Sequence, residues 1–160
     1  MLSEDEQRLE RVRAVVPQIL AAIPQARALG LEVTRVELGK IWGLAPYRPE
    51  LVGDPSTGVI AGGVLTTLLD SVCGMAVHTA VEAMQGVATL DLRIDYMRPA
   101  EPGLAVHAMA HCYKLTRTIA FVRGVAYDRD PDDPVAHSTA AFMINTGRKP
   151  GQNLPVGSAS

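Results

Sequence analysis

Two features of the stretch 58–70 are suited to chemistry: the glycine pair Gly62-Gly63 and the carboxylate of Asp70. The glycines stand between a loop and a long apolar run, so one of them is expected to open a helix whose first N–H groups lack partners. Those groups and the positive end of the helix dipole can polarise a carbonyl and hold the oxyanion that forms on attack. By itself, however, a glycine pair is better explained as a simple turn from loop to helix.

Asp70 lies two turns further along the same helix and off its main apolar stripe. Considered alone, it would be a solvated aspartate on a polar face. A solvated face normally carries Lys, Glu and Arg, however, and this one has none before Glu82. The face is therefore expected to be covered by another subunit or by a substrate, and a carboxylate placed there suits general-base or nucleophilic work. The other positions of this face are Thr66, Thr67, Ser71, Gly74, Met75 and His78.

The composition limits the possible functions. A chain of 160 residues with 48% hydrophobic and 20% charged residues is expected to form one globular domain. Its net charge of -2 offers neither a basic stripe for nucleic acid nor a cationic face for a membrane. Cys73 and Cys112 form no CxxC pair, and the N-terminus lacks the apolar segment of a signal peptide. A cytoplasmic protein is therefore expected.

Hydrophobic periodicity predicts the elements that position these residues. The stretch 3–22 reads as a helix with Ser3 and Glu6 as a capping box and with a kink or break at Pro17. A loop rich in glycine and proline over 48–60 precedes the central helix, which is expected to run to about Ala83. Strands are predicted on both sides of that helix, at 31–36, 38–47, 87–97, 104–113, 118–128 and 135–144.

This order predicts an α+β fold in which an antiparallel sheet wraps around one long helix. In the strand 87–97, strict alternation places Thr89, Asp91 and Arg93 on one face and Leu90 and Leu92 on the other. We expect an N-terminal helical segment over 1–26, the main domain over 27–146 and a disordered tail over 147–160.

The chain resembles PaaI-like hot-dog thioesterases, in which His-Gly-Gly is followed by an acidic residue seven positions after the second glycine. Gly63 and Asp70 have this spacing. The stretch 89–100 resembles the family strand that ends in Tyr-x-Arg-Pro-Ala, and the stretches 114–121 and 136–144 are similar to its basic hairpin and its last strand. The resemblance covers roughly 28–145, and it implies a hot-dog fold and hydrolysis of acyl-CoA thioesters.

The resemblance also implies roles for individual residues. Gly62 and Gly63 would offer backbone N–H groups to the thioester oxygen, and Asp70 would activate water or attack the carbonyl directly. Thr89 falls where some relatives place a hydroxyl that positions the water, contributed by the neighbouring subunit. The candidates for binding CoA are Arg98, Lys114, Arg117 and Thr118. The three cations are equally consistent with solvated strand ends and a turn.

The resemblance further implies self-association as a dimer or a dimer of dimers, with edge strands that pair across subunits and sites that use both. It implies no cofactor, because CoA is part of the substrate. Nor do the histidines predict a metal site: His107 and His111 have the spacing of helical zinc ligands but lie in a strand pattern. His78 and His137 stand alone.

Two departures from the family pattern leave alternatives open. Ala61 replaces the histidine before the glycine pair, and no Asn or Gln stands about six residues earlier, where Asp54, Pro55 and Ser56 lie. A protein that binds acyl-CoA without hydrolysing it is the alternative that this favours. A hot-dog dehydratase or hydratase is a third reading, weakened because the loop before the central helix holds no histidine. The acyl group cannot be read from these residues.

Overall fold

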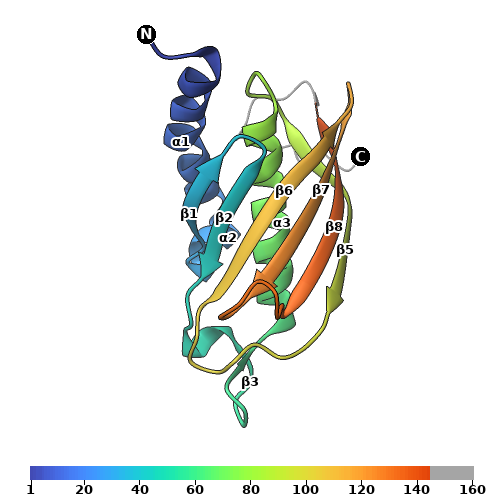
Figure 1. Ribbon diagram of the computed structural model, residues 1–160. Helices are drawn as coiled ribbons and strands as arrows, with labels where there is room; N and C mark the ends of the chain where they lie inside the picture. The colour runs from blue at the N-terminus through green and yellow to red at the C-terminus, as the bar shows by residue number, and fades with distance from the viewer. Residues whose placement is uncertain (145–160) are drawn as a thin grey trace, which may run out of the picture.

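The apolar run that begins at Gly62 forms helix α3 (Gly62–Ala80), which lies against one face of a six-stranded antiparallel sheet (Figure 1). The computed structural model describes residues 1–144. The strand order in the sheet is β1-β2-β6-β7-β8-β5, so β1 and β5 form its two edges. The strands are β1 (Glu32–Glu37), β2 (Lys40–Ala45), β5 (Val87–Tyr96), β6 (Val106–Leu115), β7 (Ile119–Tyr127) and β8 (Ala136–Ile144).

This arrangement confirms the predicted fold class, a long helix held by an antiparallel sheet. Alternation decides which strand residues face α3. In β6 the small residues Ala108 and Ala110 are fully buried, whereas His107, Met109 and His111 between them lie on the outer face. Small inward side chains let the sheet approach the helix closely. The predicted tail beyond 146 lies outside the described residues.

Two helices precede the sheet, α1 (Glu4–Ala22) and α2 (Pro24–Leu29). The predicted capping box is present: Ser3 N donates to a Glu6 carboxylate oxygen at 2.7 Å and Glu6 N donates to Ser3 Oγ at 3.2 Å. Of the predicted kink or break at Pro17, the break is wrong, because α1 continues through it to Ala22, with Ile23 as its C-cap. Burial of Val16 beside this proline offsets the lost helical hydrogen bond.

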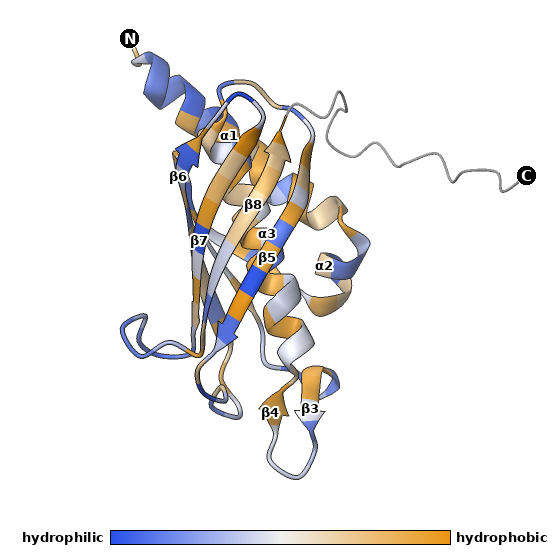
Figure 2. Ribbon diagram, turned by 90° about the vertical axis from the view of Figure 1, so that its right-hand side faces the viewer, coloured by the Kyte–Doolittle hydropathy of each residue, from blue (hydrophilic) through white to orange (hydrophobic). Residues whose placement is uncertain are grey.

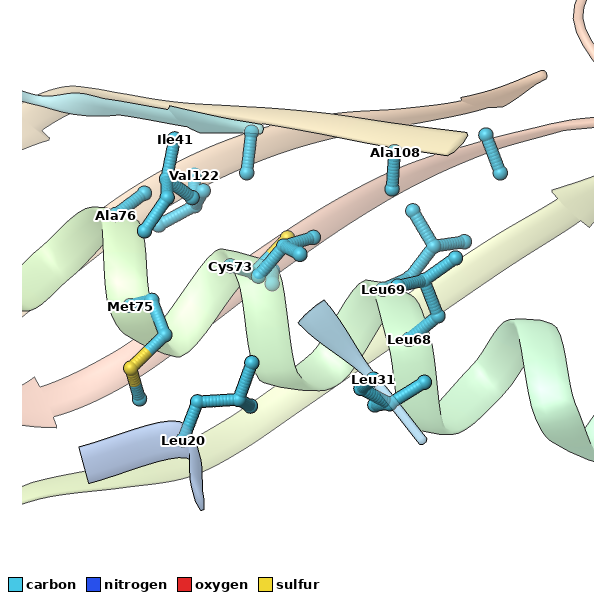
Figure 3. Packing of buried hydrophobic residues seen from close by; sticks show 14 of the residues in the cluster. Leu20, Leu31, Ile41, Leu68, Leu69, Cys73, Met75, Ala76, Ala108 and Val122 are labelled. Carbon is cyan, nitrogen blue, oxygen red and sulfur yellow. The ribbon is translucent and has the colours of Figure 1, made fainter. Parts of the chain in front are cut away.

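Helix α3 is enclosed between the sheet and the N-terminal helices (Figure 3). Ile41 and Val122 contact it from the sheet side, while Leu20 of α1 faces Met75 on the opposite side. The guanidinium of Arg8 donates to the carbonyl of Thr79 at 3.2 Å and to that of Ala80, which caps the C-terminal end of α3. The chain itself therefore covers the C-terminal half of the helix face that we expected a subunit or a substrate to cover.

The segment predicted as loop over 48–60 has structure of its own. It holds a short 3-10 helix η1 (Pro49–Leu51) and a small hairpin of β3 (Val52–Asp54) and β4 (Val59–Ile60). The hairpin projects beyond the N-terminal end of α3 (Figure 2). At its turn Asp54 Oδ1 accepts hydrogen bonds from Ser56 N at 2.9 Å and Ser56 Oγ at 2.7 Å. These local bonds explain why the turn is ordered.

A β-bulge in β5 corrects the predicted alternation of that strand. Thr89 pairs with Phe142 of β8, and the next pair is Asp91 with Ala141, so Leu90 is an extra residue. Residues that face each other across a ladder point to the same side of the sheet. Phe142 is buried beneath the sheet. Thr89 therefore shares the helix side with Leu92, and not with Asp91 as strict alternation predicted.

Helix α3 is long and apolar enough to cross a membrane by length and composition alone, and it is the one such helix among residues 1–144. Within the fold it is the core helix, with 61% of its most apolar window buried inside the domain. Its hydropathy is therefore explained by packing.

Candidate active site

The first turn of α3 presents backbone donors without partners. Its N-cap is Ala61, whose methyl group cannot accept a hydrogen bond. Val64 N donates to Ala61 O at 3.0 Å, but among the described residues no acceptor faces the N–H of Gly62 or Gly63. Both glycines are exposed, and a side chain added at Gly63 would meet nothing within 4 Å. A ligand oxygen can thus reach two free N–H groups at the positive end of the helix.

Asp70 is held by a residue from the edge strand. Thr89 Oγ1 donates to Asp70 Oδ1 at 2.9 Å. The other carboxylate oxygen, Oδ2, has no hydrogen-bond partner in residues 1–144, and the side chain is half-buried. Because Thr89 donates its single O–H to Asp70, its lone pairs remain available to accept a hydrogen bond from a ligand or water.

Within a single chain, Thr89 contacts the carboxylate of Asp70. We expected it to act on the site of a neighbouring subunit, yet it bonds to Asp70 of its own chain. The bulge at Leu90 explains this contact, because it turns Thr89 towards α3. The threonine thus orients the carboxylate directly.

The glycine pair and Asp70 lie on the same side of α3, since residues seven apart return to nearly the same angular position. Seven residues correspond to about 10 Å along the helix axis. Between them lie the exposed Thr66 and the half-buried Thr67, whose hydroxyls donate to the carbonyls of Gly62 at 3.2 Å and Gly63 at 3.0 Å. One open, uncharged face therefore carries electrophilic donors at one end and a carboxylate at the other.

Arg98 belongs to a separate network. Its guanidinium donates to the two carboxylate oxygens of Asp128 at 2.9 and 2.7 Å and to the Asp133 carbonyl at 2.7 Å. Asp128 also accepts from the backbone N–H groups of Glu101 and Arg129, both at 2.8 Å. The Arg98 bonds keep the pKa of Asp128 far below its usual range, and Asp128 in turn raises the pKa of Arg98. The charge of Arg98 is therefore compensated within this network, while those of Lys114 and Arg117 are not.

The other CoA-binding candidates lie at the exposed turn between β6 and β7. Lys114, Arg117 and Thr118 are exposed, and the side chains of both cations form no hydrogen bond or ion pair within 1–144. The turn is shaped by Thr116, whose Oγ1 donates to Ile119 O at 3.0 Å and accepts from Ile119 N at 2.9 Å. Its cations are therefore free to meet an anionic ligand.

This turn lies at the same end of the sheet as Thr89. Thr89 pairs with Phe142, and Phe142 pairs with Ala120 two residues after Thr118. Adjacent strands are about 4.8 Å apart, so Ala120 is roughly 10 Å from Thr89 across the sheet. The sequence could not show this proximity, because it depends on strand order.

The residues at the place of the missing amide do not join the site. Asp54, Pro55 and Ser56 form the turn of the projecting β3–β4 hairpin, where Asp54 is occupied by Ser56. Ala61 lies against Gly53 of that hairpin, so closely that a side chain added at Gly53 would come within 2.9 Å of the Ala61 Cα. Neither departure from the family pattern is compensated by a polar group here.

The histidines and cysteines offer no further chemistry. His107 and His111 are four residues apart in β6, about 13 Å, which is too far to share a metal ion. No group of three His, Cys, Asp or Glu suited to a metal was found in the described part of the chain. Burial lowers the pKa of His78 and raises that of Cys73 to about 12, so both remain neutral near pH 7.

Sequence reasoning missed one residue of this face, Tyr96. Its hydroxyl donates to Gly62 O at 3.1 Å and lies 2.6 Å from Thr66 Oγ1. The signal that could have found it was its place in the strand motif before Arg98, on the same face of the strand as Leu92.

Comparisons with known proteins point to one family. The model of the thioesterase superfamily matches residues 57–135, which include the glycine pair, Asp70 and the β6–β7 turn. The medium/long-chain acyl-CoA thioesterase YigI of Salmonella typhimurium is 27% identical over 135 residues, which is 76% of this chain and 86% of that protein. A Halobacterium salinarum relative is 35% identical over 83 residues, half of this chain and 55% of that protein.

Solved structures show the same fold. A Pseudomonas aeruginosa protein superposes with a TM-score of 0.75 at 40% identity, covering 85% of this chain and 98% of that one. A mutant form of the phenylacetic acid degradation protein PaaI from Thermus thermophilus gives a TM-score of 0.66 at 29% identity, covering 76% and 98%. The likeness thus extends beyond the site to the whole sheet and helix.

Proposed function

The chain belongs to the thioesterase superfamily, and from this we propose that it hydrolyses acyl-CoA thioesters to a free acid and CoA. Asp70 acts as the general base or the nucleophile, and the N–H groups of Gly62 and Gly63 polarise the thioester carbonyl. Lys114, Arg117 and Thr118 bind the CoA portion. No cofactor or metal takes part, and the reaction is placed in the cytoplasm.

One observation carries the proposal. The only carboxylate on the open face of α3 is fixed by Thr89 through one oxygen, at 2.9 Å, while its second oxygen has no partner in the described chain. A carboxylate with a free lone pair can accept a proton from water or attack a carbonyl. The unpartnered donors at the start of the same helix suit the negative charge that then develops on the thioester oxygen.

The two mechanisms make different demands on distance. For direct attack, the donor, the carbonyl and Asp70 must lie within about 7 Å, with the reacting atoms about 3–3.5 Å apart. An intervening water extends this span by about 3 Å. Gly63 and Asp70 are about 10 Å apart along the helix axis at their Cα atoms, and the Asp70 side chain leans towards the N-terminus of the helix, which shortens this span. We therefore propose a water-mediated reaction within one chain, or a site that combines Asp70 with the glycines of a second copy.

We propose that a second copy pairs along the edge strand β5. Within residues 1–144 this strand has no neighbour on its outer side. Leu90 and Tyr96 of the strand and Met97 just after it are exposed by 49%, 53% and 57%. Exposed apolar side chains on an unpaired edge favour pairing with another strand. Since β5 also carries Thr89, such a dimer brings the open faces of two α3 helices towards each other.

The test is a panel of acyl-CoA substrates assayed by thiol release, with the wild-type protein beside Asp70→Ala. The name of the relative YigI makes medium and long acyl chains the first choice. We expect release by the wild type on at least one substrate and a large loss in Asp70→Ala with an unchanged Tm. Equal rates for the two proteins on the best substrate would show that the mechanism is wrong.

A second experiment locates the site between subunits. Asp70→Ala and Gly62→Pro are mixed, unfolded and refolded together. If each site takes its glycines from one copy and its aspartate from the other, the mixture regains about a quarter of the wild-type rate, because half of the dimers hold one intact site. If each chain forms its own site, no activity returns.

The alternative is a protein that binds acyl-CoA without hydrolysing it. The observation in its favour is that Ala61 supplies no polar side chain to the site, and that Asp54 and Ser56 bond to each other away from α3. Binding by calorimetry without thiol release across the whole panel would establish this alternative.

A further inference from the structure

The hydroxyls of Tyr96 and Thr66 form a small network on the carbonyl of Gly62. Tyr96 OH lies 3.1 Å and Thr66 Oγ1 3.2 Å from Gly62 O, both within hydrogen-bond distance, and the two hydroxyl oxygens lie 2.6 Å apart. The tyrosine ring also covers Gly62, since a side chain added there would lie 3.6 Å from its Cε1. Tyr96 of the bulged strand β5 thereby packs against the first turn of α3.

The two hydroxyl protons can be arranged in two ways, and in each of them one O–H group donates a hydrogen bond to Gly62 O. If Tyr96 donates to Gly62 O, Thr66 can donate to Tyr96; if Thr66 donates to Gly62 O, Tyr96 can donate to Thr66. The contact of 2.6 Å between the hydroxyls requires one of these two arrangements. In both, Gly62 O accepts one O–H bond in addition to its bond within the helix.

A bond on this carbonyl acts on the next N–H group. In a planar trans peptide, the C=O of Gly62 and the N–H of Gly63 point in opposite directions within one plane. Fixing the oxygen therefore fixes the direction of the Gly63 N–H, and polarising the carbonyl strengthens that N–H as a donor. The first turn needs such a constraint, because two glycines without a side-chain cap would otherwise be free to fray.

We infer that Tyr96 and Thr66 are positioning residues that orient and polarise the Gly62–Gly63 peptide so that the Gly63 N–H binds the oxygen of the thioester substrate. This inference deepens the proposed function and rests on it. The hydroxyls act through the peptide and do not themselves contact the reacting atoms.

The network predicts a specific pattern of mutant effects. Tyr96→Phe and Thr66→Val each leave one hydroxyl to bond Gly62 O, so each is expected to lower kcat by less than about 3-fold. The double variant leaves none and is expected to lower kcat on the order of 10-fold with little change in KM, short of the 10²–10³ for loss of a donor. Such more-than-additive loss is typical of residues that share one partner.

Matched variants separate positioning from stability. Tyr47→Phe removes another tyrosine–carbonyl bond, from Tyr47 OH to Gly58 O at 2.9 Å, and is expected to keep full activity. Compared with Tyr96→Phe/Thr66→Val, the variant Tyr96→Phe/Thr66→Ser has one hydroxyl again, and it is expected to recover most of the lost kcat. Tm and oligomeric mass are measured for every variant, because Tyr96 lies on the exposed edge strand.

The decisive measurement is the infrared carbonyl stretch of ¹³C-labelled octanoyl-CoA bound to Asp70→Asn, with and without Tyr96→Phe/Thr66→Val. We expect a shift to lower frequency on binding to Asp70→Asn, which the added pair of substitutions largely removes. An unchanged frequency would overturn the inference even where wild-type turnover establishes the thioesterase activity. Binding without turnover still allows this measurement, so that result refutes hydrolysis alone; absence of both binding and turnover refutes both proposals.

Discussion

Asp70 and Asp128 are two aspartates of one small domain in opposite environments. Asp128 is buried, with 2% of its side chain exposed, and both of its oxygens are occupied by Arg98 and by two backbone N–H groups. Asp70 is half-buried and receives a single hydroxyl bond. A carboxylate whose lone pairs are all occupied can only stabilise the fold, whereas one with a free oxygen can accept a proton. The comparison favours Asp70, and not Asp128, for the proposed reactive role.

The largest expected effect is the loss of kcat/KM on substitution of Asp70, a loss that substitution of Asp128 should not cause. Asp70→Asn is expected to lower kcat/KM by about 10²–10⁴, because the free carboxylate oxygen is replaced by an amide that cannot act as a base. The Tm should change little, since Thr89 can still bond to the amide oxygen. Asp91→Asn, on the outer face of the strand that holds Thr89, is the matched control and should keep full activity. Similar losses in both variants would break the comparison.

The backbone N–H donors at the start of α3 give the next largest expected effect on kcat. Gly62→Pro deletes one N–H at the first position of α3, where proline fits because Ala61 already has an extended backbone with ψ of 139°. Loss of one donor is expected to lower kcat about 10²–10³. Gly62→Ala keeps the N–H and is the control. Equal kcat in the two variants, by steady-state assay, would remove Gly62 from the site.

The structural aspartate is expected to show the reverse pattern. Asp128→Asn leaves the Arg98 charge partly uncompensated and should lower the free energy of unfolding by about 2–4 kcal/mol, measured by urea denaturation. The kcat of the folded protein should stay within about 2-fold of wild type. Asp132→Asn in the same loop, whose side chain is exposed, is the control. A stable but inactive Asp128→Asn would overturn the assignment.

The pH dependence of stability gives a further test of the Asp128–Arg98 ion pair. The pKa of Asp128 is held far below its unfolded value of about 3.9, so its stabilisation is complete above that value and is lost as the pH falls towards the folded pKa. The Tm difference between wild type and Asp128→Asn should therefore be constant from pH 5 to 7 and shrink below about pH 4. A difference that does not shrink in acid would contradict the ion pair as its cause.

The smallest effect is expected at the β6–β7 turn. Lys114→Gln and Arg117→Gln should each raise KM for acyl-CoA roughly 2–5-fold without changing kcat, and the difference should fall with added salt. Arg11→Gln on the exposed face of α1 is the control. An unchanged KM in the double variant would show that the turn does not bind CoA.

The order of the elements and the place of Asp70 were predictable, because apolar periodicity and the glycine pair are local signals. The structure confirms the long helix and the four strands that follow it. What alternation could not reveal is the bulge at Leu90, since one unpaired residue changes the inward face of the strand without changing its composition. This bulge places both Thr89 and Tyr96 against α3.

Contacts between residues far apart in the chain were the other feature that the sequence could not predict. The family resemblance made Arg98 a candidate for binding the CoA phosphates, and its partner Asp128 is thirty residues away in the chain. In the same way, the covering of α3 was attributed to a partner or a substrate, whereas α1 supplies part of it. Tertiary partners decide which charged groups remain free, and periodicity carries no information about them.

The most direct test of the account is a single-turnover assay with enzyme in excess over octanoyl-CoA, comparing wild type with Asp70→Asn. This assay observes the chemical step without product release. We expect one CoA released per thioester by the wild type, at a rate at least about 100-fold above that of Asp70→Asn. Equal rates, with both proteins folded and binding the substrate, would contradict it.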